Sequence, residues 1–231
     1  MRDLISRKTI EGALSIGVVC TLVSLPCIYY HCFVGSRKEL LEIFPPRVLP
    51  GVMLLHVWQI LIVSFMCAAF GLAWSKKYGL RGIGDPKEVK RNLWKFLLVG
   101  ILVATTSYLL FDRTLSIKAP SLYPSNPLWI LSISLKASFF NEIVRFGMMA
   151  LVARLTRNIH VANIVVSGFL VYIGIRSFRL VGLGFDWDHF SLLCVGYSFI
   201  FNLLMGYLYA RFGIISTMLI QFLIGLRLLF L

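Results

Sequence analysis

The stretch that decides the fold is Ser138–Gly147, which reads SFFNEIVRFG and lies inside an apolar run from residue 127 to residue 152. A transmembrane helix needs about 20 predominantly apolar residues, so this run is long enough to cross a bilayer. It places Glu142 near mid-membrane, and Glu142 is the only one of the ten acidic residues that we expect in the hydrocarbon. Because charged groups are costly there, they usually serve a function or a specific structural contact.

The composition around this stretch is that of a membrane protein. Of the 231 residues, 58% are hydrophobic and only 14% are charged, and the mean hydropathy is +0.84. Soluble domains average about 25% charged residues. Seven apolar runs are long enough to be spans: 10–34, 51–74, 95–111, 127–152, 161–182, 191–210 and 213–230. We therefore predict an all-α, polytopic helical membrane protein with about seven transmembrane helices, within a range of six to eight, in a single integral membrane domain over residues 1–231.

The basic residues predict the orientation. A formal charge of +13 would suggest nucleic acid for a soluble chain, but in a membrane protein such an excess marks the cytoplasmic segments, so we expect no nucleic acid partner. With the N-terminus inside, thirteen bases fall on the inner side and five on the outer side. The inner set is Arg2, Arg7, Lys8, Lys76, Lys77, Arg81, Lys87, Lys90, Arg91, Lys95, Arg154, Arg157 and Arg211; the outer set is Arg37, Lys38, Arg47, Arg113 and Lys118. This distribution favours an integral protein of the plasma (inner) membrane with a cytoplasmic N-terminus.

Two local patterns predict where helices begin and end. Asp85-Pro86 follows a glycine-rich turn and is typical of a helix start, with Asp85 as the N-cap. The last two apolar runs are separated only by Arg211-Phe212, which predicts a tight helical hairpin or a helix broken near the interface.

Helical spacing groups the polar residues that fall inside the spans. Five bases lie there against the single acid: Lys136, Arg145, Arg176, Arg179 and Arg227. Residues three, four or seven apart share a helix face, which joins Glu142 and Asn141 to Arg145, and Tyr172 to Arg176 and Arg179. Asn202 and Gln221 are expected at nearly the same depth as Glu142. The predicted intramembrane cluster is Asn141, Glu142, Arg145, Tyr172, Arg176, Asn202 and Gln221.

Two further bases are candidates for contact with a partner or with lipid. Lys136 lies nine residues before Arg145, half a turn away on an ideal α-helix, and so belongs to another surface. Arg179 could act with Arg176 as a clamp for an anionic group.

Three segments resemble the CPBP or Abi intramembrane proteases, which include the type II CAAX prenyl endopeptidases. Asn141–Gly147 (NEIVRFG) is similar to the first family motif, Glu-Glu-x-x-x-Arg, which is often followed by Gly. Ser167–Arg176 (SGFLVYIGIR) is similar to the second, Phe-x-x-x-His, and Met205–Gln221 (MGYLYARFGIISTMLIQ) to the Gly-Tyr-Leu-Tyr…Arg-x-Gly-Ser…His run. The resemblance covers residues 127–231 and implies a CPBP/Abi-like core in this part of the chain.

The departures from the family motifs fall on the residues that carry its chemistry. The glutamate pair becomes Asn141 and Glu142, and the two motif histidines correspond to Arg176 and Gln221. Arg145 stands one place before the position of the motif arginine. In the family, the glutamates and histidines are taken to hold a metal or to activate water, whereas arginine has no acceptor and can serve neither purpose. We therefore expect no metal and no cofactor.

Three functions follow as alternatives. The first is a catalytically inactive relative of these proteases, in which Glu142 pairs with Arg176 or Arg145 and the protein acts as an accessory or scaffold subunit for a transmembrane or lipidated partner. The second is an active intramembrane endopeptidase with Glu142 as base, although a carboxylate beside arginines is a weaker base. The third is binding or transport of an anionic lipid by Arg176 and Arg179. Membrane lipid is an expected contact in each case.

Overall fold

The computed structural model describes residues 6–35, 40–41, 44–118, 123–180 and 189–230, without the side chains of residues 118 and 177–180. Within these ranges the chain forms helices and no strand, as predicted. The elements are α1 (Arg7–Tyr30), η1 (His31–Gly35), η2 (Pro46–Val48), α3 (Leu49–Trp74), η3 (Lys76–Tyr78), α4 (Pro86–Arg91), α5 (Leu93–Ser107), η4 (Tyr108–Asp112), α6 (Arg113–Lys118), α7 (Pro127–Lys136), η6 (Ala137–Asn141), α8 (Glu142–Thr156), α9 (Ile159–Leu180), α10 (His189–Phe212), α11 (Ile214–Leu226) and η7 (Arg227–Phe230).

Helices occupy the described parts of the seven apolar runs that were predicted to be spans. Five runs in the described residues are long and apolar enough to cross a membrane: Arg7–Gly35, Pro46–Trp74, Leu93–Ile117, Ile159–Arg176 and His189–Phe212. Ile214–Phe230 is apolar but shorter, and the continuous run α7–η6–α8 is long but carries the charged residues. The protein is thus an all-α polytopic membrane protein, and the fold-class prediction is confirmed.

The exterior of the helices is apolar, as a bilayer requires. Along α3, the side chains of Leu54, Leu55, Trp58 and Ile62 are exposed, and Leu55 keeps 68% of its surface accessible. A soluble protein rarely leaves such a continuous apolar face uncovered. This apolar face of α3 is therefore expected to contact lipid.

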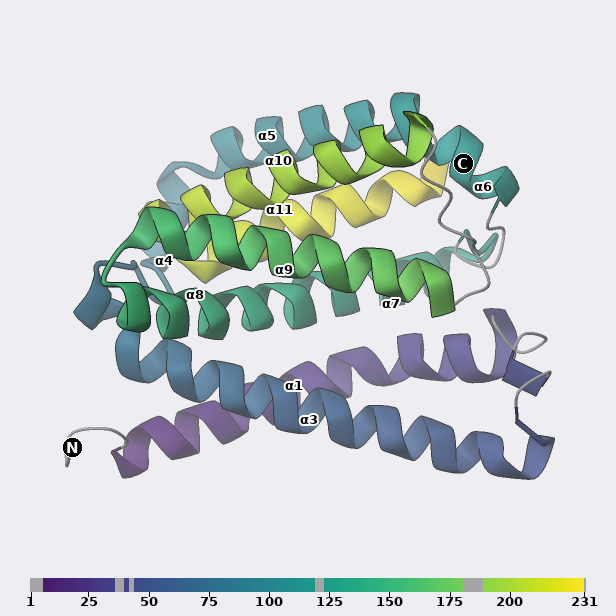
Figure 1. Ribbon diagram of the computed structural model, residues 1–231, viewed down its shortest axis with the longest axis horizontal. Helices are drawn as coiled ribbons and strands as arrows, with labels where there is room; N and C mark the ends of the chain where they lie inside the picture. The colour runs from purple at the N-terminus through teal and green to yellow at the C-terminus, as the bar shows by residue number, and fades with distance from the viewer. Residues whose placement is uncertain (1–5, 36–39, 42–43, 119–122, 181–188, 231) are drawn as a thin grey trace.

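The helix α8 lies in the middle of the bundle. It packs against α3 on one side and α9 on the other, while α1 crosses α3 beneath them, and α5, α10 and α11 lie above (Figure 1). A Cβ on Gly147 would collide with the backbone of Cys67, so this glycine permits the close approach of α8 and α3. Because α8 is central, its side chains can reach α3, α9, α10 and α11.

The end of the bundle where α3, α8 and α10 finish and α9 and α11 begin is called the basic end below. Its described charged residues include Lys76, Lys77, Arg81, Lys87, Lys90, Arg91, Arg154, Arg157 and Arg211, against the acids Asp85 and Glu88. Here α4 starts as predicted, because the Asp85 carboxylate accepts a hydrogen bond from the Lys87 N–H at 2.9 Å. The predicted hairpin is also present, with Gly213 between α10 and α11.

Gly213 separates α10 from α11 because it adopts a positive φ, which residues other than glycine rarely take. Its φ is +90°, and that of Gly84, which lies against it, is +95°. The loop of Gly84 also supplies acceptors to the new helix: the N–H of Ile214 donates to Gly82 O at 3.1 Å and that of Ile215 to Ile83 O at 3.3 Å. The loop after α3 therefore caps the start of α11.

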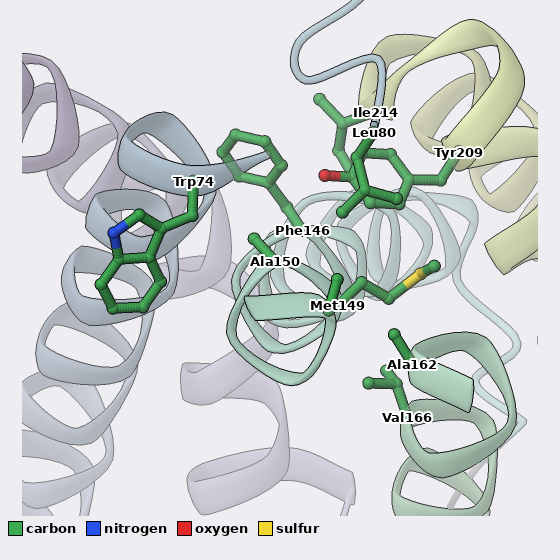
Figure 2. Close-up of a cluster of buried hydrophobic side chains, with 10 residues drawn as sticks. Trp74, Leu80, Phe146, Met149, Ala150, Ala162, Val166, Tyr209 and Ile214 are labelled. Carbon is green, nitrogen blue, oxygen red and sulfur yellow. The ribbon is translucent and has the colours of Figure 1, made fainter. Parts of the chain in front are cut away.

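A hydrophobic cluster fills the bundle near the basic end. Figure 2 shows Phe146, Met149 and Ala150 of α8 between Trp74 on one side and Tyr209 and Ile214 on the other. Met149 and Ala150 have no exposed surface. This packing fixes the position of α8, and with it the polar residues one turn earlier.

Candidate functional site

Glu142 and Arg145 lie side by side in the interior of the bundle. Glu142 is the first residue of α8, directly after the π turn η6, and stands at the middle of the helical run from Pro127 to Thr156. The Glu142 side chain has no exposed surface, and that of Arg145 is 2% exposed. The Arg145 Nε donates to Glu142 Oε2 at 3.0 Å, so the two form a buried ion pair.

The Arg145 guanidinium also binds α10. Its Nη1 donates to the backbone oxygen of Asn202 and its Nη2 to the Asn202 Oδ1, each at 2.8 Å. The Asn202 amide is held in turn, because its Nδ2 donates to Ser198 O at 2.8 Å. One planar cation thus joins an acid of α8 to two acceptors of α10, a geometry that suits arginine and that lysine cannot reproduce.

One oxygen of the Glu142 carboxylate has no hydrogen-bond partner among the described residues. This atom, Oε1, is buried. A buried acceptor without a partner costs free energy, more so when it carries charge. Oε1 is therefore the one acceptor of this ion pair still open to a donor.

The other members of the predicted cluster lie elsewhere. Arg176 and Tyr172 are both exposed on α9, where Arg176 Nη1 reaches the Tyr172 hydroxyl at 3.5 Å. Asn141 is exposed at the end of η6, and Gln221 is half-buried on α11. In the described residues no hydrogen bond joins any of these four to Glu142. Of the two partners expected for Glu142, the structure brings Arg145 to it and leaves Arg176 on the surface, since α9 turns that face away from α8.

Lys136 is half-buried at the end of α7, which packs against α1. The prediction of a partner or lipid contact at Lys136 stays a prediction. The side chain of Arg179 lies outside the described residues.

A second ion pair, between buried Asp112 and partly exposed Arg227, was missed by sequence reasoning. Asp112 has no exposed surface, and Arg227 donates to both of its oxygens, from Nε at 2.6 Å and from Nη2 at 3.1 Å. The Tyr123 hydroxyl donates to Asp112 Oδ1 at 3.0 Å, and burial together with the Asp112 charge raises the pKa of Tyr123 above its ordinary value.

Asp112 also corrects the expectation that Glu142 is the only acid within the spans. The predicted span ended at residue 111, whereas the helical run that the structure shows continues to Ile117. The signal was present, since Arg227 was one of five intramembrane bases that needed an acid.

Another missed contact joins α9 to α10. The Asn163 Nδ2 donates to Leu203 O at 3.0 Å, and Ser167 Oγ donates to Asn163 Oδ1 at 3.3 Å. A Cβ on Gly206 would collide with the Asn163 amide. An asparagine within a predicted span was the available signal, because a polar side chain in the hydrocarbon needs an interhelical partner.

The fold and these contacts define the class: a helical membrane protein whose spans are tied together by buried ion pairs and amides. No group of three or more His, Cys, Asp or Glu side chains that could hold a metal occurs among the described residues. Comparisons with protein-family models, curated proteins and solved structures found no match to this chain.

Proposed function

We propose that this protein is a catalytically inactive, CPBP/Abi-like membrane protein that acts as an accessory or scaffold subunit and binds a transmembrane or lipidated partner. The observation that supports it best is the state of Glu142. This is the acid that the resemblance would make catalytic, and Arg145 binds it in a fully buried pair.

A general base must reach the proton that it removes, or a water molecule that does so. The Glu142 carboxylate has no exposed surface, and one of its oxygens is engaged by a guanidinium. Proton transfer to that oxygen would break a contact that also positions Asn202 on α10. The arrangement suits a tie between helices better than a catalytic base.

Asn141 supports the binding role. Its amide is exposed at the middle of the α7–η6–α8 run, and it makes no hydrogen bond within the described residues. In hydrocarbon, an asparagine gains free energy by bonding to a neighbouring helix. Asn141 thus offers a recognition point for a partner span.

The basic end gives the proposed orientation. Its excess of lysine and arginine supports a cytoplasmic position under the positive-inside rule, and α1 starts at this end with Arg7 and Lys8. We assign the protein to the plasma (inner) membrane with a cytoplasmic N-terminus.

A photo-crosslinking amino acid at position 141, introduced in cells, tests the binding role. We expect a crosslink to one discrete membrane protein. In a second sample, overproduction of the same protein without the crosslinking amino acid should compete for that partner and weaken the crosslink. The matched control is position 55 on α3, which is exposed on an apolar face and should give only lipid adducts.

A peptidase assay tests the inactive state separately. Purified wild type and Glu142→Gln, reconstituted in liposomes, are given a quenched transmembrane peptide and a prenylated peptide. We expect no cleavage above that of the variant. Cleavage by wild type that Glu142→Gln abolishes would contradict the proposal.

A further inference from the structure

Two adjoining hollows lie toward the basic end, and neither is lined by Glu142 or Arg145. The first has a volume of about 410 Å³ and is lined by Ser75, Lys76, Arg81, Gly82, Gly84 and Asp85, among others. The second, of about 290 Å³, lies between α1, α8 and α11. Ile83 and Phe146 line both, so the two hollows meet at these side chains. Figure 2 shows Phe146 projecting from α8 between Trp74 and Ile214.

The first hollow has a mixed lining, with Leu72, Ile83 and Phe146 beside polar groups, and it offers donors. Lys76 and Arg81 are exposed at its rim, and the hydroxyl-bearing Ser75 is buried in its wall. Gly82 and Gly84 have positive φ, and their N–H groups donate to no backbone carbonyl of the described residues. Unpaired backbone N–H groups in such turns attract anions.

The acidic residues of this region are already engaged. The Asp85 carboxylate caps α4 through the Lys87 N–H, and Glu88 binds Arg81 at 2.7 Å. Lys76 makes no ion pair in the described residues, and Lys77, Lys87, Lys90 and Arg91 add further positive charge around it. Because Arg81 is paired with Glu88 and Asp85 also lines the hollow, the surplus positive charge that favours an anionic ligand comes from Lys76 and these four neighbours.

The second hollow is apolar. Its walls include Ile16 and Val19 of α1, Ile143 of α8, and Ile215 and Met218 of α11. Val19 lies twelve residues beyond Arg7, the start of α1, which is about 18 Å along the helix. Half of the hydrocarbon thickness is about 15 Å, so these walls lie at a height that an acyl chain of the nearer leaflet reaches.

We infer that the two hollows form a binding site for one phospholipid with an anionic head group, drawn from the leaflet at the basic end. The phosphate lies in the first hollow, near Lys76, Arg81 and the N–H groups of Gly82 and Gly84. An acyl chain passes Ile83 and Phe146 into the second hollow. This site is separate from the Glu142 pair and does not depend on the proposed function.

Retention of lipid by purified protein tests this site. Wild type is extracted from nanodiscs of equal phosphatidylglycerol and phosphatidylcholine, and native mass spectrometry counts the lipids that remain bound. We expect one phosphatidylglycerol, preferred about tenfold over phosphatidylcholine, because Lys76 and the bases around it favour an anionic head group. Lys76→Gln with Arg81→Gln should abolish the preference.

Matched variants separate the site from the general charge of this end. Lys77→Gln with Arg91→Gln removes the same charge outside the hollow and should keep the preference. Ile16→Trp fills the second hollow and should release the lipid, whereas Val18→Trp, on the exposed face of α1, should not. Equal binding of both lipids by wild type, equal loss in both charge variants, or displacement by free inorganic phosphate would overturn the proposal.

Discussion

The Arg145 guanidinium donates three hydrogen bonds, one to Glu142 and two to Asn202. A charged residue in the hydrocarbon is tolerated when its charge and its donors are satisfied, and these contacts meet that need for Arg145. They do not meet it fully for Glu142, whose Oε1 has no partner among the described residues. At this scale the site is a cation held in place by an acid and an amide.

Removal of the Asn202 side chain should weaken this arrangement. In Asn202→Leu, Arg145 loses one hydrogen bond to a neutral acceptor, and such bonds to charged groups contribute about 1.5–3 kcal/mol. We expect the free energy of unfolding to fall by about this amount, measured by titration with SDS in mixed micelles.

Gln221→Leu is the matched control for this change. Gln221 is an amide expected at the same depth, but it lies half-buried without a hydrogen bond to the ion pair in the described residues. Its replacement should change the free energy of unfolding by no more than about 0.5 kcal/mol. Equal losses in both variants would show that the Asn202 contact contributes nothing specific.

At the scale of the helix, the π turn η6 decides which residues face the site. A π turn adds one residue to the helical repeat, which rotates everything before it by about 100° relative to an ideal α-helix. Within this turn Ser138 Oγ donates to Met218 O at 2.6 Å. The half-turn separation of Lys136 and Arg145 expected from ideal spacing is reduced accordingly, and Lys136 lies half-buried toward α1.

Close packing of α8 on α3 depends on Gly147. In Gly147→Ala the new Cβ would meet the backbone of Cys67, which cannot move as a flexible side chain can. Overpacking of this kind costs about 1–3 kcal/mol, and we expect that loss in the same SDS titration.

Gly196→Ala on α10 is the control for this substitution. No atom lies within 4 Å of a Cβ at Gly196, so alanine should leave stability unchanged or raise it by about 0.5–1 kcal/mol through its better helix propensity. If Gly147→Ala were as stable as this control, the close approach of α3 and α8 would be wrong.

For the whole molecule, the sequence predicted what depends on residue type and near neighbours. Long apolar runs locate the spans because lipid selects for summed hydropathy, and Asp85 marks a helix start through local geometry. The hairpin was predicted with its break at Arg211-Phe212, whereas both residues belong to α10 and the break falls at Gly213. The pair of Asp112 and Arg227 could not be predicted in the same way, because 115 residues separate the two and only the packing of α5 near α11 brings them together.

The site around Glu142 was also predicted only in part, because spacing joins near neighbours in the sequence but not distant residues. Glu142 and Arg145 are three residues apart on one helix, so spacing alone joined them, whereas Asn202 required an estimate of depth. Depth did not determine direction: Gln221 satisfies the estimate, and Arg176 was expected further out but within reach, yet neither side chain makes a hydrogen bond to Glu142 among the described residues.

The orientation of the whole bundle can be measured by cysteine labelling. Lys87→Cys lies at the basic end and Ser125→Cys at the opposite end, and both positions are exposed. A maleimide that cannot cross membranes should label position 125 in intact cells and position 87 only after permeabilisation, as the positive-inside rule requires. Wild type, with its five free cysteines, gives the background; the reverse pattern would contradict a cytoplasmic N-terminus.

The most direct test of the central claim, that Glu142 is a structural partner of Arg145, is a double-mutant cycle with Glu142→Gln and Arg145→Gln. Arg145→Gln alone leaves a buried carboxylate unpaired and should lower the free energy of unfolding by about 3–5 kcal/mol. The double variant should be more stable than Arg145→Gln alone, because no buried charge remains. Additive losses in the double variant, with no coupling between the two positions, would contradict the account.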